Sequence, residues 1–469
     1  MPAELAALRF VPFACAPIVW VRMVPASKNA ALKTAFDARL MILPISPHAT
    51  CRSERRDSEM MRAVFPAGSF TVPSSDARVP PGYSKLRVTC RHAVIRWSSY
   101  PYRMSTPPIR TAVLGFGLAG RVFHAPFVSA VPGLELSAIV QRRGDEAAAA
   151  YPEARILRSV EEAFADPNID LIVVATPNDT HVDLTTRALQ AGKHVVVDKP
   201  FAPNSQQARN LIAASKQAGK VLAPFHNRRF DGDFLTVRKL LAESALGRVV
   251  TVRSHFDRFR PLQRPNSWKE SGGPSNGMLF DLGPHLVDQA LALFGTPSAV
   301  TASVRSDRDQ TNIDDAFAIA LHFGGKGDVP YIRYECHATM LAAEPAPRFT
   351  IHGTHGSYTK FGNDPQEAAL VAGAKVPSLA ESTPWLPEPE SAWGHLTTVA
   401  DRSNPGELRR TPVPTEPGDY RQFYVSVRDA ILGVAPLAIS AEDGFRAIRL
   451  LELARMSSER RMTLDVSFE

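Results

Sequence analysis

The pattern of apolar and polar positions changes along the chain and predicts two folded regions. From residue 109 to 224, short continuous apolar runs alternate with segments of helical period. Residues 170–175 read Asp-Leu-Ile-Val-Val-Ala, which is typical of a strand buried on both faces of a parallel sheet. The alternation predicts an α/β fold with a doubly wound parallel sheet that binds its ligand at the carboxyl ends of the strands. The other expected elements are strands at 112–114, 134–140, 194–197 and 221–223 and a helix at 204–218.

After Pro224 the apolar positions alternate with a period close to two. Residues 248–257 read as a half-buried strand, and runs at 316–323, 331–340 and 348–353 follow at hairpin-like spacing. This spacing predicts a largely antiparallel sheet in a second, α+β domain. The folded chain therefore divides into a domain of 104–224 and a domain of 225–469.

The end of the second domain has a different pattern. Two helices are expected near 420–432 and 441–458, and one of them is expected to pack back on the first domain. Residues 370–415 are rich in Pro, Glu and Ser and are predicted to be a long loop or an insertion.

The basic charge of the chain belongs to its first part. Residues 1–103 carry 15 Lys or Arg and 6 Asp or Glu, a formal charge of +9, although the whole chain has only +7. They show no sustained periodicity, which favours a disordered leader or translated upstream sequence, with Met104 as the true start. A targeting segment is the alternative, but Glu4 and the lack of a basic N-terminal run argue against a secretory signal.

Several classes of partner are not expected. No apolar run reaches membrane-spanning length, and charge spread over an irregular segment is weak evidence for nucleic-acid binding. Cys336 is the only cysteine after Met104, so a disulfide within the folded part is impossible and a reducing, cytoplasmic location fits. No metal site is expected.

A glycine motif opens the first domain. The apolar run that ends at Leu114 leads directly into Gly115-Phe116-Gly117-Leu118-Ala-Gly120, and a helical pattern follows. Strand, tight turn and helix start are the context in which this motif binds a dinucleotide. The first glycine permits the turn, the second lets the backbone approach a pyrophosphate, and the third lets helix and strand pack closely. The helix N-terminus offers N–H groups to the phosphates.

The residues after the second strand predict the choice of cofactor. An NAD site usually has Asp or Glu about 20 residues beyond the glycines, where it binds the ribose hydroxyls. Here the sequence is Gln141-Arg142-Arg143, so two guanidiniums could pair with a 2′-phosphate. A solvated loop is the other interpretation. We expect NADP, with NAD less favoured.

Two further motifs follow strands of the parallel sheet. Thr176-Pro177-Asn178 comes after the buried strand, and its position would put Asn178 near the nicotinamide ribose. A turn with residues chosen for capping is an equal alternative. Asp198-Lys199-Pro200 follows the 194–197 strand, and Lys199 would project over the cleft and hold a substrate hydroxyl. A surface lysine is the alternative.

The motif Asp281-Leu-Gly-Pro-His285-Leu-Val-Asp288 lies in the second domain. Gly283-Pro284 suggests that a helix begins between Asp281 and His285 and leaves Asp281 at its N-terminal edge. A histidine beside a carboxylate suits removal of a hydroxyl proton. Spacing alone favours a capping aspartate and a buried structural histidine.

The order of these motifs resembles the glucose-fructose oxidoreductase/inositol dehydrogenase (Gfo/Idh/MocA) family. The resemblance covers residues 109–467 and is closest to the NADP-dependent scyllo-inositol dehydrogenase subgroup, which it matches at 120–126, 225–230, 254–261 and 358–362. It implies a Rossmann domain followed by a domain with an open-faced antiparallel sheet. It also implies reversible hydride transfer at a secondary alcohol of a polyol or sugar.

The resemblance assigns roles to individual residues. It implies that Lys199 is the motif lysine, that Asp281 binds the region of the reacting hydroxyl and that His285 is the acid/base. Asp198 replaces the usual Glu before the lysine and is expected to keep its role of orienting Lys199. Contacts to the nicotinamide, the rest of the cofactor or the substrate are implied for Thr176, Pro177, Asn178, His181 and Arg228 and for Asp257, Arg258 and Arg260.

We therefore expect an NADP-dependent oxidoreductase that forms homodimers or homotetramers, because a large uncovered sheet tends to find a partner. A reductase of keto-sugars or other carbonyl compounds is the main alternative. A non-catalytic NADP-sensing regulator, an NAD-assisted glycosidase and a nucleic-acid-binding protein are further alternatives. The regulator is disfavoured because it would be expected to lose the lysine or the histidine.

Overall fold

The computed structural model describes residues 52–54, 62–64, 107–264, 270, 273, 275–325, 327, 329–381, 385–401 and 404–468. The chain forms two compact units, Met1–Pro101 and Tyr102–Glu469. In the first unit, β1 (Arg52–Glu54) and β2 (Arg62–Val64) pair in antiparallel fashion. The remainder of 1–103 lies outside the described residues, so the interpretations of this segment stay predictions.

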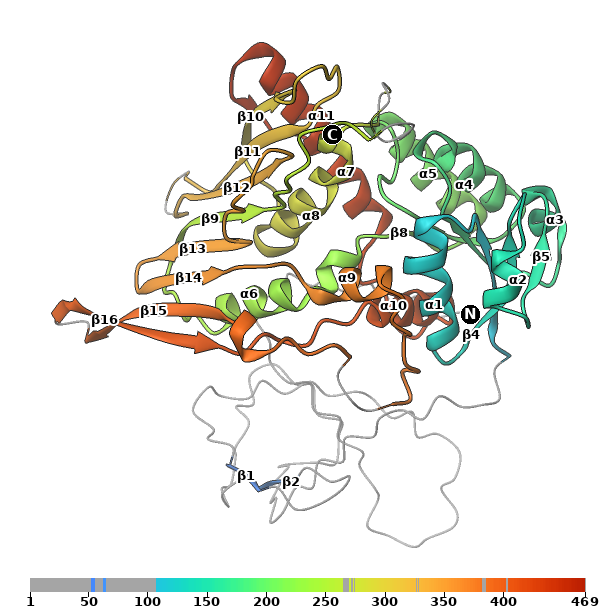
Figure 1. Cartoon of the computed structure of the whole chain (residues 1–469), viewed down its shortest axis with the longest axis horizontal. Coiled ribbons are helices and arrows are strands. Elements are labelled where there is room, and N and C mark those ends of the chain that lie inside the picture. Colours follow the sequence, from blue (N-terminus) through green and yellow to red (C-terminus); the bar gives the residue numbers. More distant parts are fainter. Residues whose placement is uncertain are drawn as a thin grey trace, which may run out of the picture. The chain divides into compact units, whose positions relative to one another are not determined.

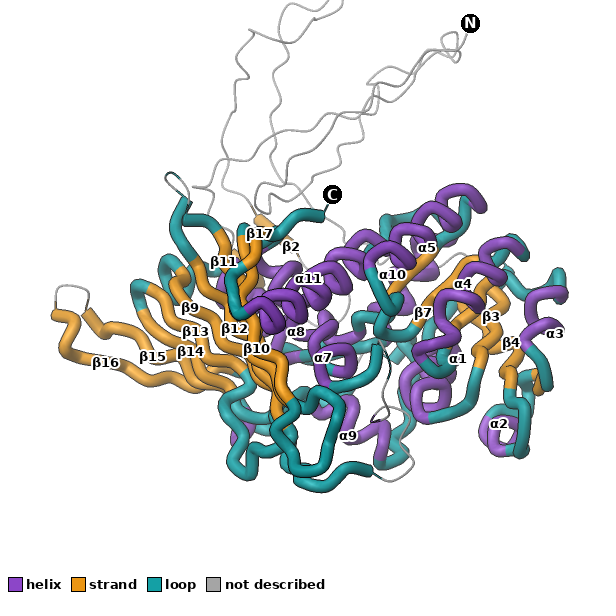
Figure 2. The backbone as a smooth tube through the Cα atoms, turned by 90° about the horizontal axis from the view of Figure 1, so that it is seen from above, coloured by secondary structure: helices purple, strands orange, loops and turns teal. Residues whose placement is uncertain are grey.

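Six parallel strands form the first sheet of the second unit, which confirms the predicted parallel sheet and adds β5 to the five expected strands. Their order is β5-β4-β3-β6-β7-β8, which places the strand before the glycine motif at the centre. Figure 1 labels the two edge strands, β5 and β8. All four residues of the run Leu-Ile-Val-Val are buried, because helices cover both faces (Figure 2). The strands are β3 (Ile109–Leu114), β4 (Leu134–Val140), β5 (Arg155–Leu157), β6 (Leu171–Val174), β7 (His194–Val197) and β8 (Leu222–Pro224). The helices are η1 (Gly120–His124), α1 (Ala125–Ala130), α2 (Glu146–Ala150), α3 (Val160–Ala165), η2 (Asn178–Thr180), α4 (His181–Gln190) and α5 (Ser205–Ala218).

Nine strands form the second sheet, in the order β16-β15-β14-β13-β9-β12-β11-β10-β17. All its neighbouring strands pair in antiparallel fashion except β9 and β12, which are parallel, so the predicted mainly antiparallel sheet is confirmed. The strands are β9 (Val249–His255), β10 (Ala299–Arg305), β11 (Ala316–Phe323), β12 (Ile332–Thr339), β13 (Phe349–Gly353), β14 (Gly356–Lys360), β15 (Gly394–Asp401), β16 (Asn404–Val413) and β17 (Leu464–Asp465). The helices of this region are η3 (Asn227–Phe230), α6 (Gly232–Ala242), α7 (Met278–Asp281), α8 (Gly283–Phe294), α9 (Pro365–Val371), η5 (Glu390–Ala392), α10 (Arg421–Ile431) and α11 (Ala441–Arg460).

The last two helices join the two sheets. We expected one of them to pack back on the first region, but both do: α10 packs against α1, and α11 packs against α5 and β8. The helix α11 also packs against α8 and β10 (Figure 1). One apolar core therefore runs from β6 and β7 through α11 to the large sheet. Within the described ranges no helix combines the length and the hydrophobicity that a bilayer crossing requires.

The prediction of a long loop at 370–415 is wrong for residues 394–413, which form two strands. This segment contains the hairpin of β15 and β16, which lies at one edge of the large sheet. Pro412 hides the strand pattern, yet it pairs with His395 in the hairpin. An edge strand tolerates proline because the N–H groups on its outer side have no strand to bond.

Candidate active site

The glycine turn after β3 leaves space for a phosphate group. Gly115 has φ +95°, and a Cβ there would lie 2.8 Å from the Ala175 carbonyl oxygen. A Cβ on Gly120 would lie 2.0 Å from the Gly115 carbonyl oxygen, so the helix can start this close to the strand only with glycine. A Cβ on Gly117 would meet no atom within 4 Å. The turn therefore presents open backbone at Gly117, which fits a pyrophosphate.

The two residues between the glycines have different surroundings. Phe116 packs edge-on against Tyr151, with 6.1 Å between the ring centroids, whereas 54% of Leu118 is exposed. The Arg121 N–H bonds the Gly117 carbonyl at 3.0 Å, so the helical backbone begins directly beside the open glycine. Phe116 thus anchors the turn, and Leu118 lies on its open side.

Arg142 and Arg143 lie on the surface at the end of β4. Gly115 donates its N–H to the Val140 carbonyl at 3.0 Å, so β4 ends beside the glycine turn. The side chain of Gln141 accepts a backbone N–H of α2 at 2.9 Å, which fixes the start of the loop. Both arginines are exposed, and their expected contact with a 2′-phosphate stays a prediction.

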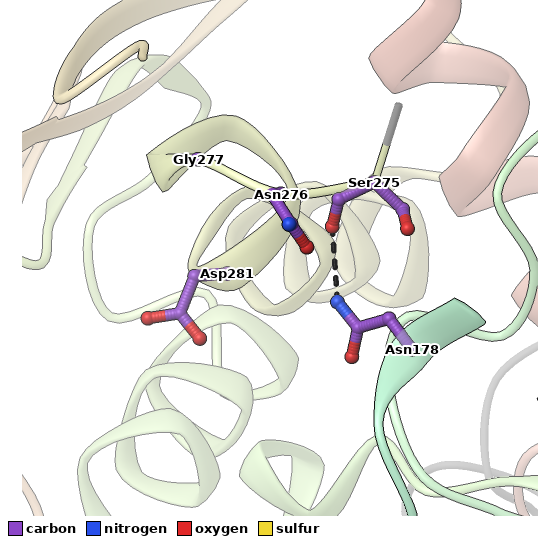
Figure 3. Close-up of a pocket in the computed structure, with 5 residues that line it drawn as sticks. All are labelled: Asn178, Ser275, Asn276, Gly277 and Asp281. Atoms are coloured by element: carbon purple, nitrogen blue, oxygen red, sulfur yellow. Dashed lines mark hydrogen bonds between the residues drawn. The ribbon is translucent and has the colours of Figure 1, made fainter. Parts of the chain in front are cut away.

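The turn Thr176-Pro177-Asn178 connects the two regions. The Asn178 side-chain amide donates to the Ser275 carbonyl at 2.9 Å (Figure 3). These two residues line a pocket together with Asn276, Gly277 and Asp281. Asn178 therefore stands where the first sheet meets the loop before α7.

His181 is buried beside the same turn and holds it in place. It is 1% exposed, and its ring nitrogens lie 2.9 Å from the Pro200 carbonyl and 3.0 Å from the Thr176 carbonyl. The ring thus links the turn to the Lys199-Pro200 segment, whose peptide bond is cis. This geometry makes His181 a positioning residue, and its expected contact with the cofactor stays a prediction.

Lys199 spans the junction between the two sheets. Its Nζ donates to the Asp281 carbonyl and to Asp281 Oδ1, each at 2.8 Å. Arg258 Nη1 lies 3.6 Å from Asp281 Oδ2. Asp281 ends α7, and α8 begins at Gly283, so the expected helix start between Asp281 and His285 agrees with the structure. Three predicted site residues are therefore brought together from distant segments.

Asp198 supports Lys199 through its backbone. Its Oδ1 accepts the Lys199 N–H at 2.7 Å, and its Oδ2 lies 3.8 Å from His124 Nε2. The other nitrogen of His124 lies 2.7 Å from the Tyr424 hydroxyl, and both rings are fully buried. Burial alone would raise the pKa of Asp198, but His124 and Lys199 outweigh it and lower the pKa to about 2. This carboxylate is therefore charged at neutral pH.

His285 lies in a buried position at the start of α8. It is 6% exposed, its ring meets Phe256 edge-on at 6.4 Å, and its Nδ1 has no hydrogen-bond partner among the described residues. Burial lowers the pKa of His285 well below the usual value, and the cations Arg228 and Lys199 act in the same direction. The imidazole is therefore neutral at pH 7 and can accept a proton.

Arg228 belongs to a buried ion-pair network. It pairs with Asp231 at 3.2 Å and with Glu367 of α9, and its guanidinium lies 4.7 Å from the centre of the Phe256 ring. Its expected contact with cofactor or substrate stays a prediction. Glu367 was not anticipated from the sequence, because no motif marked it.

The three predicted substrate residues of 257–260 do not face one way, since neighbours in an extended chain point to opposite sides. Asp257 Oδ2 lies 3.3 Å from His255 Nδ1 and accepts a backbone N–H, also at 3.3 Å. Arg258 reaches Asp281. Burial and the charge of Arg258 lower the pKa of Arg260, and Asp281 is among the groups that act on it. Arg258 therefore contacts Asp281, whereas the expected substrate contacts of Asp257 and Arg260 stay predictions.

A second supporting pair was also missed. Asp288 is 1% exposed and accepts two hydrogen bonds from Arg229, at 2.8 and 2.6 Å. The pair fastens α8, which carries His285, to η3, which carries Arg228. A signal was present, because Asp288 lies one helical turn after His285 in the same motif.

Two protein-family models match this chain, one over the region of each sheet. Residues 109–226 match a model described as oxidoreductase family, NAD-binding Rossmann fold. Residues 238–466 match a model described as oxidoreductase family, C-terminal alpha/beta domain. The first match contains the glycine turn and Lys199, and the second contains Asp281 and His285.

Individual relatives match almost over their whole length. The uncharacterized oxidoreductase YdgJ of Escherichia coli is 41% identical over 358 residues, which are 76% of this chain and 98% of YdgJ. The scyllo-inositol 2-dehydrogenase (NADP(+)) IolW of Bacillus subtilis is 34% identical, covering 77% of this chain and 97% of IolW. The solved structure of the oxidoreductase YPO2259 of Yersinia pestis has a TM-score of 0.71 and 40% identity, covering 77% of this chain and 98% of that one.

Proposed function

This chain belongs to the Gfo/Idh/MocA oxidoreductase family, and we propose that it is an NADP-dependent dehydrogenase of a cyclic polyol or sugar. The reaction interconverts a secondary alcohol and its ketone, as at a carbon of scyllo-inositol. One observation carries the proposal: Lys199 of the first region is hydrogen-bonded to Asp281 of the second, and the buried, neutral His285 follows Asp281 at the start of α8. The similarity to IolW, named as a scyllo-inositol dehydrogenase, supports the substrate class.

The residues present fit a dinucleotide. The open backbone at Gly117 would hold the pyrophosphate, and Asn178 would lie near the nicotinamide end, because it lines the pocket that includes Asp281. When bound, the cofactor supplies the nicotinamide that takes up hydride from the carbinol carbon or returns it.

The side chains around Asp281 handle the hydroxyl proton. Lys199 orients the reacting oxygen, and Asp281 fixes the lysine through two hydrogen bonds of 2.8 Å. His285 accepts the proton during alcohol oxidation and donates it during ketone reduction. Such a base contributes roughly 10²–10⁴-fold to the rate. Asp198, His181 and the Arg229–Asp288 pair hold these groups in place without touching the substrate.

The preference for NADP rests on the exposed pair Arg142 and Arg143. A planar guanidinium makes charge-assisted hydrogen bonds to a phosphate, and the Gln141 position lacks the carboxylate that NAD sites use. The name of IolW as an NADP(+) enzyme supports the same choice. A keto-sugar reductase is the second candidate, because His285 serves either direction. The 1,5-anhydro-D-fructose reductase of Ensifer adhaerens is 30% identical over 208 residues.

We also propose that copies of the chain associate through the large sheet. The helices α8 and α11 pack on one face of it, and side chains such as Val250 and Tyr331 on its strands or strand ends are 38% and 43% exposed (Figure 2). Sedimentation of the full chain tests this, with a dimer or tetramer expected and a monomer contradicting it.

The activity is tested by following reduced-nicotinamide absorbance with NADP and then with NAD. The substrates are a panel of inositols, aldoses and keto-sugars. We expect reduction of NADP with scyllo- or myo-inositol and slower turnover with NAD. Oxidation of NADPH by keto-sugars without any alcohol oxidation would favour the reductase. Tight NADP binding without turnover in either direction would contradict the proposal.

A further inference from the structure

Glu367 brings a second carboxylate to the candidate site. It lies on α9, which packs against η1, the helix that follows the glycine turn (Figure 1). Its Oε2 pairs with Arg228, whose guanidinium lies over the same Phe256 ring that meets His285. The helix α9 thus delivers an acidic side chain to the region where both sheets contribute residues.

The Glu367 carboxylate can accept more hydrogen bonds than its pair with Arg228 uses. Arg228 already has the fully buried Asp231 as a partner at 3.2 Å, whereas the Glu367 side chain is 37% exposed. A carboxylate offers about four acceptor positions, and the ion pair engages only one of the two oxygens of Glu367. The other oxygen can therefore accept hydrogen bonds from a ligand.

Glu367 and Asp281 share the same cations. Burial would raise the pKa of Glu367, but Arg228, Arg258 and Lys199 outweigh it and lower the pKa. Lys199 and Arg258 also pair with the Asp281 carboxylate. Glu367 is also linked to His285 through Arg228 and the Phe256 ring, which places a second charged carboxylate beside the candidate substrate site.

We propose that Glu367 accepts hydrogen bonds from hydroxyl groups next to the reacting carbinol and makes the site selective for neutral polyols over anionic analogues. This inference rests on the proposed function, since it concerns the same substrate site. Vicinal hydroxyls are donors that a carboxylate can bind together, and a carboxylate or phosphate on the substrate would be repelled. Hydrogen bonds to a charged group typically change affinity by roughly 10- to 100-fold.

The test compares the full-length wild type with Glu367→Gln, which keeps the shape and removes the charge. Each enzyme is assayed with the neutral and the anionic member of two substrate pairs. The first pair is myo-inositol and an inositol monophosphate, and the second is glucose and glucuronate. Glu161→Gln is the matched control, because Glu161 pairs with Arg187 on the exposed surface of α3 and α4. NADPH affinity and thermal stability are measured for all variants.

For Glu367→Gln we expect KM for the neutral substrate to rise about tenfold or more, with kcat changed less. The ratio of kcat/KM for the neutral over the anionic substrate should fall at least tenfold. NADPH affinity should stay within about threefold, and Glu161→Gln should match the wild type. A Glu367→Asp variant, which keeps the charge, should retain the discrimination even if its KM is raised.

A folded Glu367→Gln enzyme with an unchanged ratio would overturn the inference while leaving the proposed function intact. Loss of the preference for neutral over anionic substrates in Glu367→Asp would also overturn the inference. If Glu367→Gln does not fold, the result for Glu367→Asp decides the test. A wild type that turns over no neutral polyol or sugar would overturn the proposed function and the inference with it. A wild type that prefers the anionic member of each pair would overturn the inference alone.

Discussion

The glycine turn after β3 offers its ligand open backbone, whereas the junction around Asp281 offers charged side chains from both sheets. At Gly117 the chain leaves room where a Cβ would meet nothing within 4 Å. Around Asp281, in contrast, Lys199 and Arg258 converge on one carboxylate. A backbone site needs no partner residues, but each charge at a side-chain site needs another group to hold it.

Substitutions should therefore act differently in the two regions, the glycine turn and the junction around Asp281. In the first region, a substitution acts by filling space or by removing a surface charge. In the second, removing one member of a buried pair leaves the other charge uncompensated, which typically costs about 3–5 kcal/mol of stability. Arg229 and Asp288 form such a pair, with the carboxylate 1% exposed. Supporting residues of the second region should thus affect stability and activity together.

The largest effect is expected for His285→Ala. Loss of the proton acceptor should lower kcat roughly 10²–10⁴-fold, while NADPH affinity changes little because the glycine turn is untouched. Steady-state kinetics and a fluorescence titration of NADPH measure the two quantities. His352→Ala is the control, since His352 lies exposed on β13 and contacts Ser357. A folded His285→Ala enzyme with wild-type turnover would remove His285 from the mechanism.

Arg142→Ala combined with Arg143→Ala should act on the cofactor alone. Loss of two charge-assisted contacts to the 2′-phosphate should weaken NADP binding roughly 10- to 100-fold and leave NAD binding unchanged. The dissociation constants of both cofactors measure this. Equal weakening of both would show that the arginines do not read the phosphate, and NAD preference in the wild type would reject the NADP assignment.

Gly117→Ala and Gly120→Ala should distinguish a glycine that leaves room for the cofactor from a glycine that allows close packing of helix and strand. A Cβ on Gly120 would collide with the Gly115 carbonyl, so unfolding free energy should fall by about 1–3 kcal/mol. At Gly117 stability should change by less than about 0.5 kcal/mol, but NADPH affinity should fall. Denaturant unfolding and NADPH titration distinguish the two. Unchanged cofactor affinity in Gly117→Ala would mean that the pyrophosphate does not approach this turn.

The smallest effect is a displaced pH profile. Burial and the nearby Arg228 and Lys199 lower the pKa of His285, whereas Asp281 opposes them, so protonation occurs only below the usual imidazole value of 6.5. Alcohol oxidation needs the neutral ring. Its kcat/KM should therefore stay constant as the pH falls past 6.5 and should decline only at a lower pH. Ketone reduction needs the protonated ring and should show the opposite slope. A decline in kcat/KM for alcohol oxidation that already begins above pH 6.5 would contradict the role of His285 as the proton acceptor.

Prediction from sequence succeeded where one short segment determines both structure and chemistry. The run before Gly115 and the glycine spacing define a strand, a turn and a helix start together, and β4 and β7 have the predicted bounds. The hairpin of β15 and β16 was missed because an edge strand carries proline. Composition could not separate this strand from a loop.

The candidate site was predicted less completely than the fold. Lys199, Asp281 and His285 stand in motifs, so they could be named, and the structure places Lys199 on Asp281. Glu367 could not be found, because its role depends on how α9 packs and not on its neighbours in the chain.

The most direct test of the account is the fate of the carbinol hydrogen. A neutral polyol or sugar that the enzyme oxidises is prepared with deuterium on the reacting carbon and incubated with the full chain and NADP. Reduced cofactor is then examined by NMR and mass spectrometry. The account predicts one deuterium at C4 of the nicotinamide for each ketone formed, with no exchange into water. Deuterium released to solvent, or cofactor left without net reduction, would contradict direct hydride transfer at this site.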